Sequence, residues 1–154
     1  MAAVRAVAVL SSMLAGPMAA AAQATPAQLD SPPTIDCTVG FDGLKTAALA
    51  LPGAQASEVG GFDLVAQERA ETWRVEFFFT TRWHPAYPAV ALRTLRKQVT
   101  GVWTADSKAC GYGDQEQFAV LVDDMKSSDK ALTDASRAEV ERKKRSRSPL
   151  SPGP

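Results

Sequence analysis

The sequence predicts an α+β fold: an N-terminal helix, a four-stranded antiparallel meander and a C-terminal helix packed on the sheet. Apolar residues recur at helical spacing over residues 41–51, and a second helical stripe runs from Phe118 to Leu132. Between them, residues 62–104 alternate with a period of two, which is typical of half-buried strands. We expect both helices to cover one face of this sheet, because a half-apolar sheet must bury that face against another layer.

The strands are predicted at residues 62–67, 73–80, 90–99 and 102–104, and residues 109–113 contain too much glycine for regular structure. Residues 82–88 must leave the sheet, because their two prolines have no N–H group to donate. The third strand has a helical alternative, but the Thr100-Gly101 turn and the strand after it favour a hairpin. Asp114 is the expected N-cap of the last helix.

The 154-residue chain divides into four segments by composition. Residues 1–24 have the basic start, short apolar run and A-x-A ending of a signal peptide cleaved near Ala24. A membrane anchor is the alternative, but the run is short for about 30 Å of hydrocarbon. Residues 25–35 form a proline-rich linker, residues 36–135 a single α+β domain and residues 136–154 a basic, disordered tail. A continuation of the last helix over residues 136–147 is the alternative, but its apolar stripe is thin. We therefore expect a periplasmic or secreted protein without a transmembrane segment in its mature chain.

Two cysteines and one histidine exclude zinc sites built from four cysteines or from two cysteines and two histidines, and also four-cysteine iron–sulfur sites. We expect no metal and no cofactor. No serine lies in a G-x-S-x-G motif, and no catalytic residue is assigned. The balanced charge, 17 basic against 17 acidic residues, gives no reason to expect specific nucleic-acid binding. Cys37 and Cys110 are predicted to form a disulfide, which an oxidising compartment permits.

Aromatic residues supply the candidate ligand contacts. His84 is the only histidine, and its neighbourhood is either a binding loop or a proline-stiffened turn at the end of the sheet. Alternation places Phe78 on the face opposite Phe77 and Phe79, so Phe78 is either covered or part of an exposed apolar groove. The candidate ligand contacts are Trp83, His84, Tyr87, Tyr112 and Phe78.

A cluster of basic residues near the C-terminus is a candidate contact for an anionic surface, with a solvated tail as the alternative. The cluster consists of Arg142, Lys143, Lys144, Arg145 and Arg147.

The HPAYP turn at residues 84–88 and the GVWTADSKACGYGDQEQFAVL segment at residues 101–121 resemble a group of small exported bacterial proteins of unknown function. The resemblance covers residues 36–132 and carries no catalytic residue. We expect an exported, non-enzymatic binding or accessory module of the bacterial cell envelope, whose aromatic sheet contacts an envelope protein or a small apolar ligand. The alternative is a small-ligand carrier or small enzyme with a pocket near His84 and Tyr112.

Overall fold

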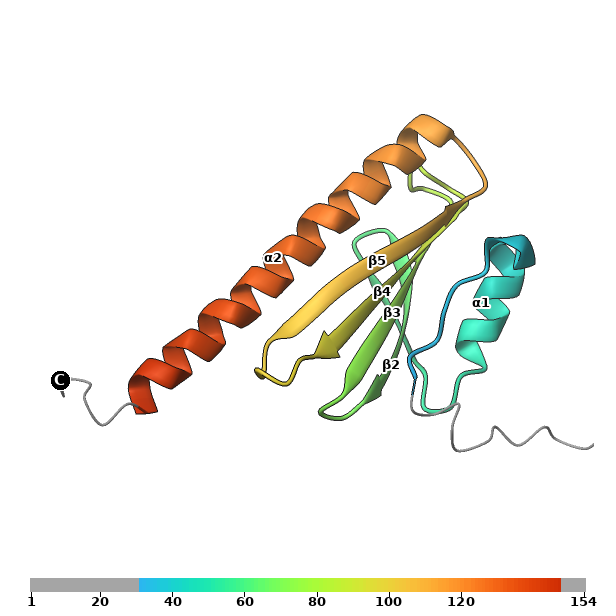
Figure 1. Cartoon of the computed structure of the whole chain (residues 1–154). Helices are drawn as coiled ribbons and strands as arrows, with labels where there is room; N and C mark the ends of the chain where they lie inside the picture. The colour runs from blue at the N-terminus through green and yellow to red at the C-terminus, as the bar shows by residue number, and fades with distance from the viewer. Residues whose placement is uncertain (1–30, 148–154) are drawn as a thin grey trace, which may run out of the picture. The chain divides into compact units, whose positions relative to one another are not determined.

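The computed structural model describes residues 31–147 (Figure 1). The expected signal peptide, the first part of the linker and the last seven residues lie outside this range. The elements in chain order are η2 (Cys37–Val39), α1 (Phe41–Leu49), β1 (Gln55–Val59), β2 (Phe62–Arg69), β3 (Trp73–Thr80), β4 (Ala89–Lys97), β5 (Trp103–Gly111) and α2 (Gln115–Arg147).

The α+β class and the antiparallel meander are confirmed, but the sheet has five strands, in the order β1-β2-β3-β4-β5. The prediction of four strands missed β1, whose residues are all exposed and therefore show no apolar alternation. The irregular segment predicted at residues 109–113 is also wrong in part, because β5 continues to Gly111. A Cβ at Gly111 would lie 2.4 Å from the ring of Phe118, so glycine lets the start of α2 pack against this strand.

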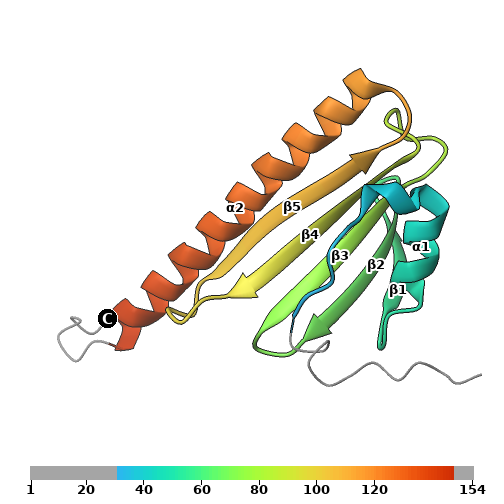
Figure 2. The ribbon, with the colours of Figure 1, turned by 45° about the vertical axis from the view of Figure 1, so that its right-hand side comes forward.

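The two helices lie on opposite faces of the sheet, so the expectation that both cover one face is wrong (Figures 1 and 2). Helix α1 packs on the face that carries Phe77 and Phe79. Helix α2 packs on the face that carries Phe78. The reason is visible in β3, where three consecutive phenylalanines point alternately to the two faces and leave neither face polar.

The predicted linker contributes to the α1 face. Pro32 is buried, and Ile35 packs against the core of Leu44, Phe77 and neighbouring side chains. In Figure 2 this segment runs along the strands on the side of the sheet that α1 covers. The described end of the linker is therefore part of the folded layer.

Helix α2 is fixed to the sheet by a buried arginine. The guanidinium of Arg93 donates from Nε to Oδ1 of Asp129 at 2.8 Å and from Nη2 to Oγ of Ser128 at 3.0 Å. Nη1 lies 3.5 Å from the carboxylate of Glu76 on β3. The guanidinium carbon also lies 5.1 Å from the ring centroid of Phe78. Arg93 and Asp129 are 8% and 6% exposed, so the buried carboxylate of Asp129 depends on this guanidinium for compensation.

The C-terminal half of α2 covers the outer edge of β5. The backbone N–H of Trp103 donates to Oγ of Ser136 at 2.8 Å, and that of Ala105 donates to Oγ1 of Thr133 at 3.0 Å. The prediction of a disordered tail from residue 136 is therefore wrong for residues 136–147, which are helical. The sequence indicated otherwise because this part of the helix has few apolar residues, while its contact with the sheet is made by hydroxyl groups.

We predict that Arg93→Ala lowers the free energy of unfolding by about 3–5 kcal/mol, because it leaves the carboxylate of Asp129 buried without its partner. The double variant Arg93→Met with Asp129→Leu removes both charges at similar volume, and we expect it to recover most of that loss. Urea unfolding followed by circular dichroism measures both. An Arg93→Ala variant as stable as the parent chain would contradict the assigned role of this ion pair.

Candidate functional site

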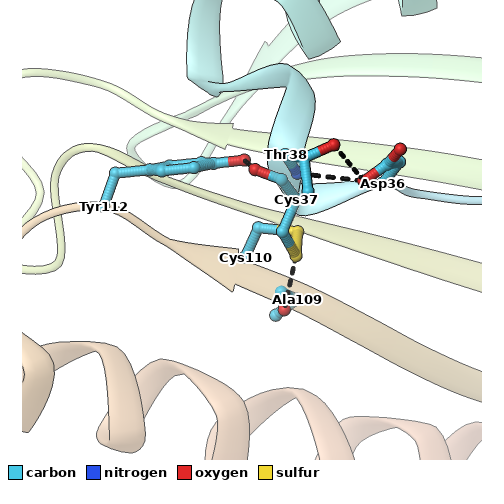
Figure 3. Close-up of a disulfide and its surroundings, with 6 residues drawn as sticks. All are labelled: Asp36, Cys37, Thr38, Ala109, Cys110 and Tyr112. Carbon is cyan, nitrogen blue, oxygen red and sulfur yellow. Dashed lines mark hydrogen bonds between the residues drawn. A yellow bond between two sulfur atoms is a disulfide. The ribbon is translucent and has the colours of Figure 1, made fainter.

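A disulfide holds the segment before α1 against the end of β5 (Figure 3). Cys37 and Cys110 are bonded, with a Cα–Cα distance of 5.4 Å across a separation of 73 residues. The predicted disulfide is thus present, and it joins the start of η2 to the end of β5. Oδ1 of Asp36 caps η2 by accepting from the backbone N–H of Thr38 at 2.9 Å.

Tyr112 supports the same junction. Its hydroxyl donates to the carbonyl oxygen of Cys37 at 3.0 Å. Burial, and then the negative charge of Asp36, raise the pKa of Tyr112, so its phenol keeps the proton that this hydrogen bond requires. The backbone N–H of Tyr112 donates to the carbonyl oxygen of Pro88, which ties the disulfide to the loop between β3 and β4.

This loop, residues 81–88, is called the Trp83 loop below. Buried Thr80 closes its base, because its hydroxyl both donates to the carbonyl of Ala89 at 2.9 Å and accepts from the N–H of Ala89 at 2.8 Å. Within the loop, the N–H of His84 donates to the carbonyl of Thr81 and that of Tyr87 donates to the carbonyl of His84, both at 2.9 Å. Consecutive tight turns thus restrict the loop backbone.

The loop displays an aromatic side chain to solvent. Trp83 is 87% exposed, whereas most of a folded protein's tryptophan surface is ordinarily buried. Tyr87 is 43% exposed and packs edge to face on Phe41 of α1, with ring centroids 5.6 Å apart. Phe41 in turn packs edge to face on the core residue Phe79. Tyr87 therefore has a continuous ring-to-ring connection to the core.

An open pocket of about 390 Å³ lies beside the loop. Its apolar side is formed by Phe41, Trp83 and Tyr87, and its polar side includes the ion pair of Lys45 and Asp63, whose Nζ and Oδ2 are 2.6 Å apart. The remaining lining residues are Asp42, Glu58, Thr80, Thr81 and Arg82. The pocket combines aromatic surface with both signs of charge.

The structure divides the predicted ligand contacts among three places. Trp83 and Tyr87 line the pocket. The rings of His84 and Phe78 both lie against the ring of Phe62, with centroid distances of 4.7 Å and 5.8 Å. Tyr112 lies at the disulfide. The structure thus does not place His84 or Tyr112 in the lining of this pocket.

His84 has the environment of a neutral structural residue. Its Nδ1 accepts a hydrogen bond from the backbone N–H of Ala86 at 3.1 Å, and its ring lies against Phe62. Partial burial lowers the pKa of His84 below the ordinary value of 6.5. A protonated ring would lose the Nδ1 acceptor, because both nitrogens of a charged imidazole carry hydrogen.

The basic cluster forms the last turns of α2. Arg142 and Lys143 pair with Glu139, and Lys144 pairs with Glu141 at 3.0 Å. Cations at a helix C-terminus are also stabilised by the helix dipole. Ion pairs within α2 and a position at the C-terminal end of the helix therefore account for this cluster of basic residues.

Sequence reasoning missed the contribution of α1 to the site. Phe41 and Lys45 lie four residues apart on one helical face, and only the position of α1 over the sheet brings them beside the Trp83 loop. Helical spacing revealed that face but assigned it entirely to the core. No local signal distinguishes a core phenylalanine from one that also supports a surface aromatic.

No protein-family model matches the chain, and neither a curated protein nor a solved structure does. Within residues 31–147, no group of three or more His, Cys, Asp or Glu side chains is arranged to hold a metal ion. None of the helices in this part of the chain combines the length and the apolar character that crossing a bilayer requires.

We predict that His84 contributes a pH-dependent share of the stability. The pKa of His84 is lower in the folded chain than in the unfolded chain, so the unfolded chain binds this proton more readily. The contribution of neutral His84 to the stability is therefore present above about pH 6.5 and is lost as the pH falls through the pKa of the folded state. Asparagine offers a side-chain oxygen in place of Nδ1 and does not titrate. We expect the melting temperature to fall less between pH 7.5 and pH 5 in His84→Asn than in the parent chain. Equal falls would contradict a neutral His84.

Proposed function

We propose that this protein is a non-enzymatic binding module of the bacterial cell envelope, and that it docks a partner protein through the Trp83 loop. The observation that carries the proposal is the 87% exposure of Trp83 on a loop whose backbone is restricted by internal hydrogen bonds. Burying a large apolar side chain that is otherwise held in water lowers the free energy, so a partner that covers Trp83 would be stabilised in the complex.

The composition of the loop supports the same function. Arg82, Trp83 and Tyr87 belong to the three residue types that dominate binding energy at protein interfaces. A restricted loop also loses little conformational freedom on binding, which lowers the entropic cost of association. The exposed tryptophan projects outward, a shape suited to insertion into a pocket of a partner.

The cellular location is part of this proposal. The disulfide between Cys37 and Cys110 is consistent with an oxidising compartment. Together with the export signal expected in residues 1–24, it supports a periplasmic or secreted location.

A small-ligand carrier is the second candidate, and the pocket of about 390 Å³ is the observation that favours it. This volume lies within the range of small-molecule sites. Such a ligand would contact Phe41, Trp83 and Tyr87, and the lining offers both cations and carboxylates for its polar groups.

Site-specific photo-cross-linking in living cells tests the proposal. A photoreactive phenylalanine analogue replaces Trp83 in one variant and Val99 in the control, because Val99 is also fully exposed but lies in the turn at the other end of β4. We expect a discrete protein adduct from position 83 and none from position 99. With the partner identified, Trp83→Ala should weaken its binding at least about thirtyfold, the effect of an interface residue worth about 2 kcal/mol.

Equal labelling from both positions, or none from position 83, would contradict a docking role for the loop. Native mass spectrometry separates the second candidate. A small molecule retained by the parent chain and lost in Trp83→Ala would favour a ligand carrier.

A further inference from the structure

The two edges of the sheet differ in how they are covered. On β5, α2 hydroxyls accept from the N–H groups of Trp103 and Ala105, and Sγ of Cys37 lies 3.9 Å from the carbonyl oxygen of Ala109. On β1, all five residues are exposed, and no described segment other than β2 pairs with the strand. An uncovered edge strand is a template for another strand, which is why edges are usually blocked.

The turn after β1 determines which backbone groups face outward. Gly60 and Gly61 have φ values of 54° and 85°, as a two-residue type I′ turn requires, so the flanking Val59 and Phe62 form a hydrogen-bonded pair. Hydrogen-bonded and non-hydrogen-bonded pairs alternate along an antiparallel ladder. The N–H and C=O groups of Ala56 and Glu58 therefore point away from β2.

We propose that β1 pairs with β1 of a second copy of this chain, antiparallel and centred on Ser57. The two outward-facing residues are two positions apart, so a two-fold axis through Ser57 places Ala56 opposite the partner's Glu58 and Glu58 opposite the partner's Ala56. Both of these pairs become hydrogen-bonded pairs, and four outward donors and four outward acceptors are satisfied at once.

The side chains of β1 favour this register. Glu58 is the one charged residue in the strand, and it lies opposite an alanine instead of its own counterpart. Gln55 lies opposite the partner's Val59, which is 49% exposed in the single chain. The strand contains neither lysine nor proline, the residues that commonly block an edge.

The pairing goes beyond the proposed function and does not depend on it. It joins two five-stranded sheets into one of ten strands. Glu58 also lines the pocket beside the Trp83 loop, so the two pockets would flank the new interface. Two five-residue strands bury less than the about 1,200 Å² of a standard interface, so we expect association that is reversible and depends on concentration.

Cysteine cross-linking tests the register of this β1–β1 pairing. The protein used is the form of the chain that accumulates in the producing cell. Ser57 faces its own counterpart in a non-hydrogen-bonded pair, where Cα atoms are about 4.5 Å apart, within disulfide range. Gln55→Cys is the matched control, because position 55 lies on the same strand and face but is four residues, about 14 Å, from its counterpart. Under mild oxidation we expect Ser57→Cys to form covalent dimers and Gln55→Cys to remain monomeric.

A second variant tests the backbone contacts without a new thiol. Ala56→Pro removes an outward N–H that pairs with no other residue in the described range 31–147, so we expect an unchanged circular dichroism spectrum and loss of the dimer in analytical ultracentrifugation. Parent protein that sediments as a monomer up to millimolar concentration would overturn the proposal. So would equal cross-linking at positions 55 and 57, or a dimer that persists in folded Ala56→Pro.

Discussion

The structure depends on one constraint: the sheet is apolar on both faces and therefore needs a cover on each. Phe77 and Phe79 point to one face, and Phe78 points to the other. Burying a phenylalanine side chain stabilises the fold by about 1.5–3 kcal/mol, so neither face can be left to water without a large loss. Helix α1 and the segment before it cover the first face. Helix α2 covers the second, where Arg93 and Asp129 fix its position and Phe78 supplies a ring under the guanidinium.

The same arrangement positions the Trp83 loop. Helix α1 brings Phe41 against Tyr87, and the disulfide holds η2, which directly precedes that helix, to the end of β5. In the chain-entropy model, closing a loop of this length stabilises a domain by roughly 4 kcal/mol, a large fraction of the total for a chain of this size. Tyr112 links the disulfide to Pro88 at the end of the loop. The exposed tryptophan thus lies on a loop whose end is tied to the disulfide.

Features that follow local patterns could be predicted from the sequence. The period of two identified β2, β3 and β4, and Asp114 caps α2 as expected, with its carboxylate accepting from two backbone N–H groups. Strand β1 could not be found this way, because an exposed edge strand needs no apolar face. The opposite placement of the helices was not found either, although Phe78 carried the signal that both faces needed cover. The helical extension to Arg147 was only the alternative to a disordered tail, because hydroxyl groups, not apolar ones, hold it to β5.

The central claim is that the fold holds Trp83 in water on a rigid loop. Backbone ¹⁵N relaxation of residues 81–84, 86 and 87 tests this claim most directly, because the order parameter separates a rigid backbone, at about 0.85, from a flexible one below about 0.6. The claim predicts values in this loop equal to those of β3 and β4. Values below about 0.6 at Trp83 and its neighbours, with rigid strands on either side, would contradict it.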